Sequence, residues 1–95
     1  MIRVAGDCAE VSGPMTLSAA TALLAEGEAA IASAATAFDL AAVTDLDSSC
    51  LAVVFGWMRA AKAAGKSLRL MNPPSNLLSL AAVYDVAELL PQHKL

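Results

Sequence analysis

With 95 residues, the chain is long enough for one domain over residues 1–95 and too short for a second independent core. Six Lys and Arg stand against nine Asp and Glu, and the net charge of −3 argues against binding to a nucleic-acid backbone. Hydrophobic residues make up 58% of the chain and charged residues only 16%, which suggests contact with a membrane or a partner, or an unusual core.

The high hydrophobic content does not predict a membrane-spanning helix. Such a helix needs about 20 consecutive apolar residues, whereas no stretch without a charge is longer than residues 11–25, which contain Gly, Pro, Ser and Thr. The N-terminus has no apolar run behind Arg3 and reaches an acid at Asp7, unlike a secretory signal. Much of the 58% is alanine, which has little surface to bury. We therefore expect a cytoplasmic chain without direct membrane insertion.

The first predicted element is a β-hairpin. Ile2 and Val4 alternate with their neighbours, and residues 8–11 alternate in the same way. Gly6 and Asp7 stand between the two runs and supply a turn. Two short strands are therefore expected at the N-terminus.

A helix is predicted to follow this hairpin. Gly13 and Pro14 interrupt the chain, and Thr16 can cap the helix that comes next. Leu17, Leu24 and Ile31 recur at seven-residue spacing, which favours a helix over residues 17–32.

The rest of the chain alternates strands with helices. In order, the patterns predict a strand from residue 36 to a loop at 44–47, a helix from 48 to 65, a strand at 67–71, a helix at 75–83 and a helical turn at 86–90. The order of elements indicates an α/β fold, with helices covering a face of a mixed four-stranded sheet.

The cysteines and the histidine do not predict a metal or catalytic centre. Cys8 and Cys50 are far apart and lack CxxC spacing, so reduced structural thiols are expected. His93 is the only histidine and stands near the end of the chain. Neither a zinc site nor a His-based triad has its usual set of residues, and no cofactor is expected.

Acids and hydroxyls gather at residues 45–51, where a strand is predicted to lead into a helix. Asp47 or Ser48 can act as the N-cap, and local capping is the simplest interpretation. A second interpretation makes Ser48 a phosphate acceptor, because a phosphoryl group there would meet the N–H donors of the helix start. A nucleophilic serine is the third, although it lacks a neighbouring histidine.

The same predicted helix carries two apolar stripes. The first, which we assign to the sheet, consists of Leu51, Val54, Phe55 and Met58. The second consists of Val53, Trp57, Ala60 and Ala64. Either the second stripe packs against the neighbouring helix, or it forms a partner-binding face centred on Trp57, a residue type enriched at interface hot spots.

The segment FDLAAVTDLDSSCL at residues 38–51 resembles the strand, acidic loop and Asp-Ser-Ser-x-Leu helix start of STAS domains. The segment SGPMT at residues 12–16 is similar to the family's turn before the first helix. Further along, Trp57, residues 70–74 and residues 84–86 most resemble the MlaB-like branch. The similarity spans nearly the whole chain and implies a STAS-like α/β fold.

The resemblance to MlaB-like proteins implies a non-enzymatic adaptor. Such a protein binds and supports the ATPase subunit of an Mla-type ABC system, which moves phospholipid and maintains outer-membrane lipid asymmetry. The chain would then be cytoplasmic and peripheral to the inner membrane through the complex. Together with the second apolar stripe, this predicts partner binding by Asp47, Ser48, Ser49, Val53 and Trp57, with a weak homodimer left open. No phosphate-cradling Gly-x-x-x-x-Gly-Lys-Ser/Thr loop is present.

The resemblance also leaves an alternative, an anti-sigma factor antagonist that binds a kinase-like anti-sigma factor. The family's phosphorylatable residue corresponds to Ser48, with Ser49 as the second choice. Cys50 stands where the family usually has Gly, and we expect it to crowd the approach of a kinase. Asp85 stands where a helix-ending Gly is common, and Asp can adopt the left-handed conformation at modest cost.

Overall fold

The computed structural model describes residues 1–86. Its elements are, in chain order, β1 (Ile2–Ala5), β2 (Cys8–Met15), α1 (Leu17–Ser33), β3 (Ala37–Leu46), α2 (Ser49–Ala63), β4 (Arg69–Met71) and α3 (Ser75–Val83). This order confirms the one predicted from the sequence. The predicted helical turn at residues 86–90 lies almost entirely outside the described residues.

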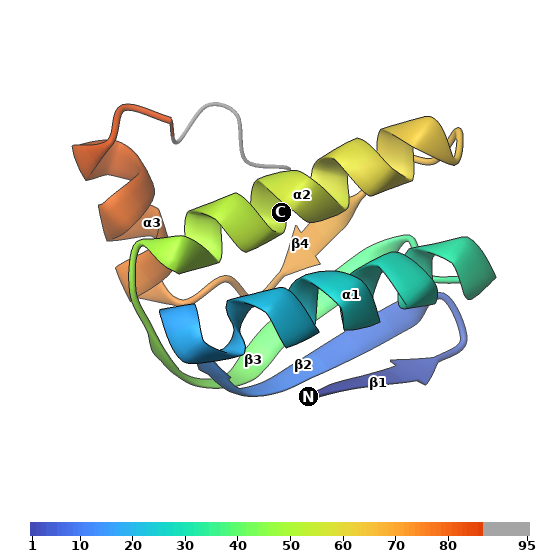
Figure 1. Cartoon of the computed structure of the whole chain (residues 1–95), viewed down its shortest axis with the longest axis horizontal. Helices are drawn as coiled ribbons and strands as arrows, with labels where there is room; N and C mark the ends of the chain where they lie inside the picture. The colour runs from blue at the N-terminus through green and yellow to red at the C-terminus, as the bar shows by residue number, and fades with distance from the viewer. Residues whose placement is uncertain (87–95) are drawn as a thin grey trace.

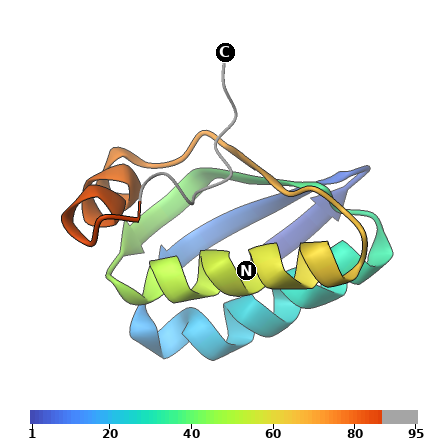
Figure 2. The ribbon, with the colours of Figure 1, turned by 90° about the horizontal axis from the view of Figure 1, so that it is seen from above.

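Four strands form one mixed sheet in the order β1-β2-β3-β4. β1 and β2 pair antiparallel as the predicted hairpin, with Ile2 opposite Val11. β2 with β3, and β3 with β4, pair in parallel. Parallel neighbours need long connections, and here α1 and α2 provide them. Both helices lie side by side over one face of the sheet, while α3 lies beside the beginning of α2 (Figures 1 and 2).

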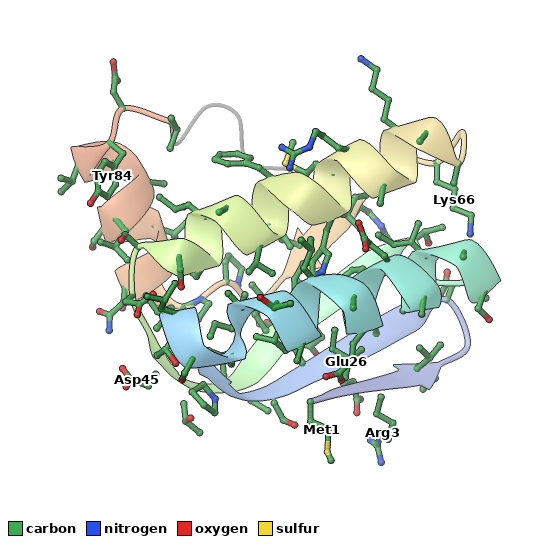
Figure 3. All side chains as sticks on the ribbon, in the orientation of Figure 1. Met1, Arg3, Glu26, Asp45, Lys66 and Tyr84 are labelled. Carbon is green, nitrogen blue, oxygen red and sulfur yellow. The ribbon has the colours of Figure 1, made fainter. Side chains whose placement is uncertain are left out.

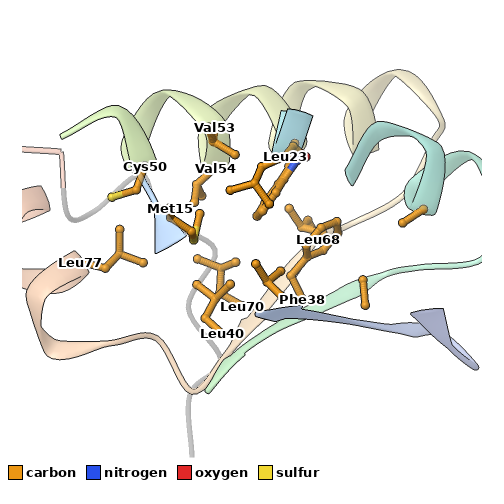
Figure 4. Close-up of a cluster of buried hydrophobic side chains, with 14 of the residues drawn as sticks. Met15, Leu23, Phe38, Leu40, Cys50, Val53, Val54, Leu68, Leu70 and Leu77 are labelled. Atoms are coloured by element: carbon orange, nitrogen blue, oxygen red, sulfur yellow. Dashed lines mark hydrogen bonds between the residues drawn. The ribbon is translucent and has the colours of Figure 1, made fainter. Parts of the chain in front are cut away.

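The core lies between this sheet face and the helices (Figure 4). Ala9, Val11 and Met15 from β2 and Phe38 and Leu40 from β3 are all buried. Alternation of side chains along a strand places these residues on one face. Their burial fixes which face of the sheet the helices cover.

The structure corrects the expected break at Gly13 and Pro14. β2 continues through both residues to Met15 and stays paired with β3. The pairing register shifts at two places, between Glu10 and Ser12 and between Gly13 and Pro14. Gly13 has a φ of 83°, which a residue without Cβ adopts at little cost, and a bulge can accommodate a proline without an N–H. The turn signal therefore marks an irregularity inside a strand.

Most predicted element bounds hold to within a few residues, but the loop expected at residues 44–47 is wrong, because β3 continues through Leu46. α1 extends to Ser33, and α3 spans the predicted residues 75–83. α2 ends at Ala63, and Gly65 follows with a φ of 74°. That left-handed glycine allows the N–H of Lys66 to bond back to the carbonyl of Ala61 at 2.8 Å, as is common after a helix end.

Trp57 holds α1, α2 and the sheet together. Its indole is fully buried and stacks on Phe38 of β3 with the ring centroids 4.4 Å apart. Its Nε1–H donates to the carbonyl oxygen of Leu23 in α1 at 3.1 Å. The indole lies against the backbone of Gly27, so a Cβ on that residue would overlap three indole atoms. A reciprocal contact places Leu24 of α1 against Gly56 of α2.

This packing predicts that Gly27→Ala destabilises the fold by about 1–3 kcal/mol, as overpacking does. The Trp57 ring cannot easily move aside, because Phe38 and the Leu23 carbonyl hold it. The free energy of unfolding from urea titration measures the effect.

Gly56→Ala is the matched control. A Cβ there would meet Leu24 Cδ1 at 2.5 Å, but this atom is the end of a flexible side chain. Both substitutions gain about 1 kcal/mol of helix propensity, so we expect Gly56→Ala to remain within about 1 kcal/mol of the wild type. Equal destabilisation by the two variants would contradict the role assigned to the indole.

Candidate functional site at the start of helix α2

One carboxylate joins the starts of two helices. Asp47 Oδ1 accepts a hydrogen bond from the backbone N–H of Ser49 at 2.9 Å and a second from the Ser49 hydroxyl. Asp47 Oδ2 accepts from the backbone N–H of Leu17, the first residue of α1, at 3.1 Å. Helix N-termini present unpaired N–H groups and partial positive charge, which a carboxylate satisfies. Asp47 is therefore the capping side chain at both starts.

The two other cap candidates do not use their side chains in this way. Thr16 precedes α1 and Ser48 precedes α2, but neither makes a side-chain cap hydrogen bond. Asp47, which lies 30 residues after Leu17, therefore caps α1 in place of Thr16. Parallel pairing of β2 with β3 brings this distant acid to the start of α1.

Hydrogen bonds hold the pKa of Asp47 below its ordinary value. The Ser49 hydroxyl is the largest cause, followed by the N–H groups of Leu17 and Ser49. Donors to the charged form of a carboxyl favour that form. The carboxylate is therefore a weak base, even though Ser48 is its neighbour in the chain.

Ser48 and Ser49 have different environments. The Ser48 side chain is exposed at the surface, whereas Ser49 is half-buried and its hydroxyl donates to Asp47. The N–H groups at the start of α2 are also occupied: Ser49 N bonds to the Asp47 side chain, and Cys50 N bonds to the Asp47 carbonyl at 3.0 Å. Leu51 N bonds to the Ser48 carbonyl at 3.2 Å. Ser48 is thus the hydroxyl offered to another molecule, without a free N–H cluster beside it.

Cys50 points into the core. Its side chain is fully buried, and burial, with a smaller contribution from Asp47, raises the pKa of its thiol to about 11. The expectation that Cys50 crowds the surface beside Ser48 is therefore wrong, because an inward side chain leaves that surface unchanged. Asp85 has a φ of 59°, which confirms the left-handed conformation expected after α3.

The structure excludes the partner-binding face expected around Trp57 and confirms the other interpretation, in which Trp57 packs against the neighbouring helix α1. Val53 is only 3% exposed and Trp57 is fully buried, so the two side chains pack inside the domain. Phe55 and Met58, assigned to the sheet from the sequence, are instead half-buried and line an open hollow of about 370 Å³ with Arg59 and Lys62. The interior glycines Gly27 and Gly56 are the sequence signal for close helix packing that this assignment missed.

Within residues 1–86, no group of three His, Cys, Asp or Glu side chains could hold a metal ion. Cys8 and Cys50 are both free thiols. No helix in the described part of the chain is long and apolar enough to cross a membrane.

Comparison with known proteins assigns the fold to a family. The family model described as "Mlab, STAS domain" matches residues 3–91. The chain belongs to the STAS domain family. The resemblance seen at residues 38–51 and the expected STAS-like α/β fold are thereby confirmed.

Two solved structures share the fold of this STAS domain. The unphosphorylated form of the anti-sigma factor antagonist SpoIIAA matches with a TM-score of 0.71 and 18% identity, over 99% of this chain and 87% of that one. The phosphorylated form of SpoIIAA, a Bacillus cell fate determinant, matches with a TM-score of 0.67 and 18% identity, over 99% and 90% of the two chains. No protein with a curated description matches the chain in sequence.

The bonds at Asp47 predict how stability of this STAS domain changes with pH. A carboxyl whose pKa is lowered by folding stabilises the fold above its unfolded pKa, and the stabilisation is lost as pH falls through the folded pKa. The ordinary value is 3.8. Asp47→Asn can keep an acceptor for Ser49, but its amide nitrogen cannot accept from Leu17. We expect wild type to be more stable than Asp47→Asn near neutral pH, with the difference shrinking below pH 3.8.

Urea unfolding of both proteins between about pH 7 and pH 3 measures this difference. Asp7→Asn, in the exposed turn between β1 and β2, controls for the loss of one negative charge. A wild-type advantage that persists unchanged through the acidic range would contradict the role of the ionised carboxylate.

Proposed function

We propose that the chain is a non-enzymatic adaptor that binds and supports the cytoplasmic ATPase of an Mla-type ABC system. Such a system transports phospholipid and maintains outer-membrane lipid asymmetry. The observation that carries the proposal is the match of the Mlab family over residues 3–91. In this role the chain is cytoplasmic and reaches the inner membrane only through the complex.

The contact surface in this proposal is the start of α2, with Asp47, Ser48 and Ser49. Ser48 offers an exposed hydroxyl that can donate and accept a hydrogen bond. Asp47 and Ser49 hold the loop in place through bonds to the starts of α1 and α2. A contact site benefits from this rigidity, because little conformational freedom is lost on binding.

The same geometry supports binding rather than catalysis. A nucleophilic serine needs a general base to remove its proton. The Asp47 carboxylate accepts three hydrogen bonds and has a lowered pKa, so it is poorly suited to that role. We therefore assign Ser48 to partner contact and not to covalent chemistry.

The alternative is an anti-sigma factor antagonist switched by phosphorylation of Ser48. The shared fold with SpoIIAA and the exposure of Ser48 favour it. Against it, the first N–H groups of α2 already have partners, so a phosphoryl group would not find the free donors that would stabilise it. Asp47 and Asp45 would add like-charge repulsion. The adaptor is therefore our first proposal.

Substitution of Ser48 tests the contact. We expect Ser48→Ala to cost about 1 kcal/mol of binding to the ATPase subunit, as the loss of one hydrogen bond does. Ser48→Asp should weaken binding further, because it would place an additional charge in a desolvated contact. Isothermal titration with the purified ATPase subunit measures both affinities.

Ser67→Asp, in the exposed segment after α2, provides the matched control and should bind like wild type. Unchanged affinity in Ser48→Asp would place Ser48 outside the interface. Stable binding of the wild-type chain to a kinase-like anti-sigma factor, with none to the ATPase, would replace the adaptor proposal by the alternative.

A further inference from the structure

A hollow lies beside the start of α2, between α3 and the end of β3. It is open to solvent, has a volume of about 320 Å³ and is lined by Leu46, Asn76, Ser79, Leu80 and Val83. We call this space the α3 hollow. Leu46, which lines it, directly precedes Asp47, so the hollow lies next to the Ser48 site. Its apolar lining comes from two elements that are far apart in the sequence.

Three of the five large apolar side chains that are exposed among the described residues belong to this end of the molecule, and the other two are Met1 and Val4. Val83 is 77% exposed and Tyr84, which follows it, is 55% exposed. Leu17 is 75% exposed, and its N–H is bound by Asp47 next to Leu46. Large side chains left in water as a group mark a binding surface more often than single ones do.

Among residues 1–86, the charges near the α3 hollow are all negative. Asp45 and Asp47 follow one another closely at the end of β3, and Asp85 follows α3. The Lys and Arg residues among the described residues are Arg3, Arg59, Lys62, Lys66 and Arg69. None of them lies on α3, at the end of β3 or in the first turn of α2, and Figure 3 shows Lys66 at the opposite end from Asp45 and Tyr84.

We infer that the α3 hollow receives an apolar segment of the ATPase subunit that is flanked by Lys or Arg. This inference rests on the proposed function and specifies the chemistry of the partner surface. Apolar side chains of the segment fill the space lined by Leu46, Leu80 and Val83. Its basic flanks face Asp45 and Asp85, since charge complementarity steers and aligns such contacts.

Two substitutions at one position separate shape from charge. Val83→Lys and Val83→Glu remove the same apolar side chain but add opposite charges. Because Val83 is exposed, we expect neither substitution to destabilise the fold. We expect Val83→Lys to weaken ATPase binding about tenfold or more and Val83→Glu to weaken it several-fold less. Wild-type affinity should also fall as salt rises.

Titration calorimetry with the ATPase subunit measures these affinities, and Val4→Lys on β1, at 42% exposure, is the control expected to bind like wild type. If Val83→Lys and Val83→Glu weaken ATPase binding equally, or if Val83→Glu weakens it more, the inference of a basic partner segment is wrong. If Ser48→Asp weakens binding while neither Val83 variant does, the proposed function stands and this inference falls. If wild type does not bind the ATPase, both are wrong.

Two other occupants would also overturn the inference. A second copy of the chain would be revealed if wild type sediments as a dimer that Val83→Lys converts to a monomer without changing ATPase binding. Occupation of the hollow by the chain's own residues 87–95 would be visible in the methyl signals of the full chain without partner. In that case a Leu89→Lys, Leu90→Lys double variant would shift the methyl signals of Leu80 and Val83.

Discussion

The contact between Trp57 and Gly27 is the constraint on which the rest of the structure depends. One indole stacks on Phe38 of β3, donates to the Leu23 carbonyl of α1 and lies against the Gly27 backbone. It therefore sets how close α1 comes to α2 and how both helices sit on the sheet. Because closely packed interiors tolerate little extra volume, the absence of a side chain at residue 27 matters as much as the presence of the indole at 57.

The helix arrangement in turn creates the site. With α1 and α2 side by side, their N-termini come near the ends of the parallel strands β2 and β3, where Asp47 bonds to both helix starts. This use of Asp47 and Ser49 leaves the Ser48 hydroxyl directed to the surface. The same end of the molecule carries the α3 hollow and several acidic groups, so the features that support partner binding lie together.

Local sequence patterns predicted most elements, because their causes are local. Gly6 and Asp7 mark the hairpin turn, Gly65 follows the end of α2, and Asn-Pro-Pro at residues 72–74 separates β4 from α3. Errors occurred where a distant residue decides the outcome. Gly13 and Pro14 remain inside β2 because β3 pairs with them, and Thr16 loses its expected capping role to Asp47.

The sequence by itself determined the order of strands and helices, the STAS resemblance and the concentration of acids and hydroxyls at residues 45–51. These depend on spacing along the chain, which periodicity and turn chemistry reveal. Only the tertiary structure decided which members of the two apolar stripes of α2 are buried, placing Trp57 inside and leaving Phe55 and Met58 partly exposed. A helix with two apolar faces does not by itself determine which face packs against which neighbour. Here Gly27 of α1 determines it, because it leaves room for the Trp57 indole.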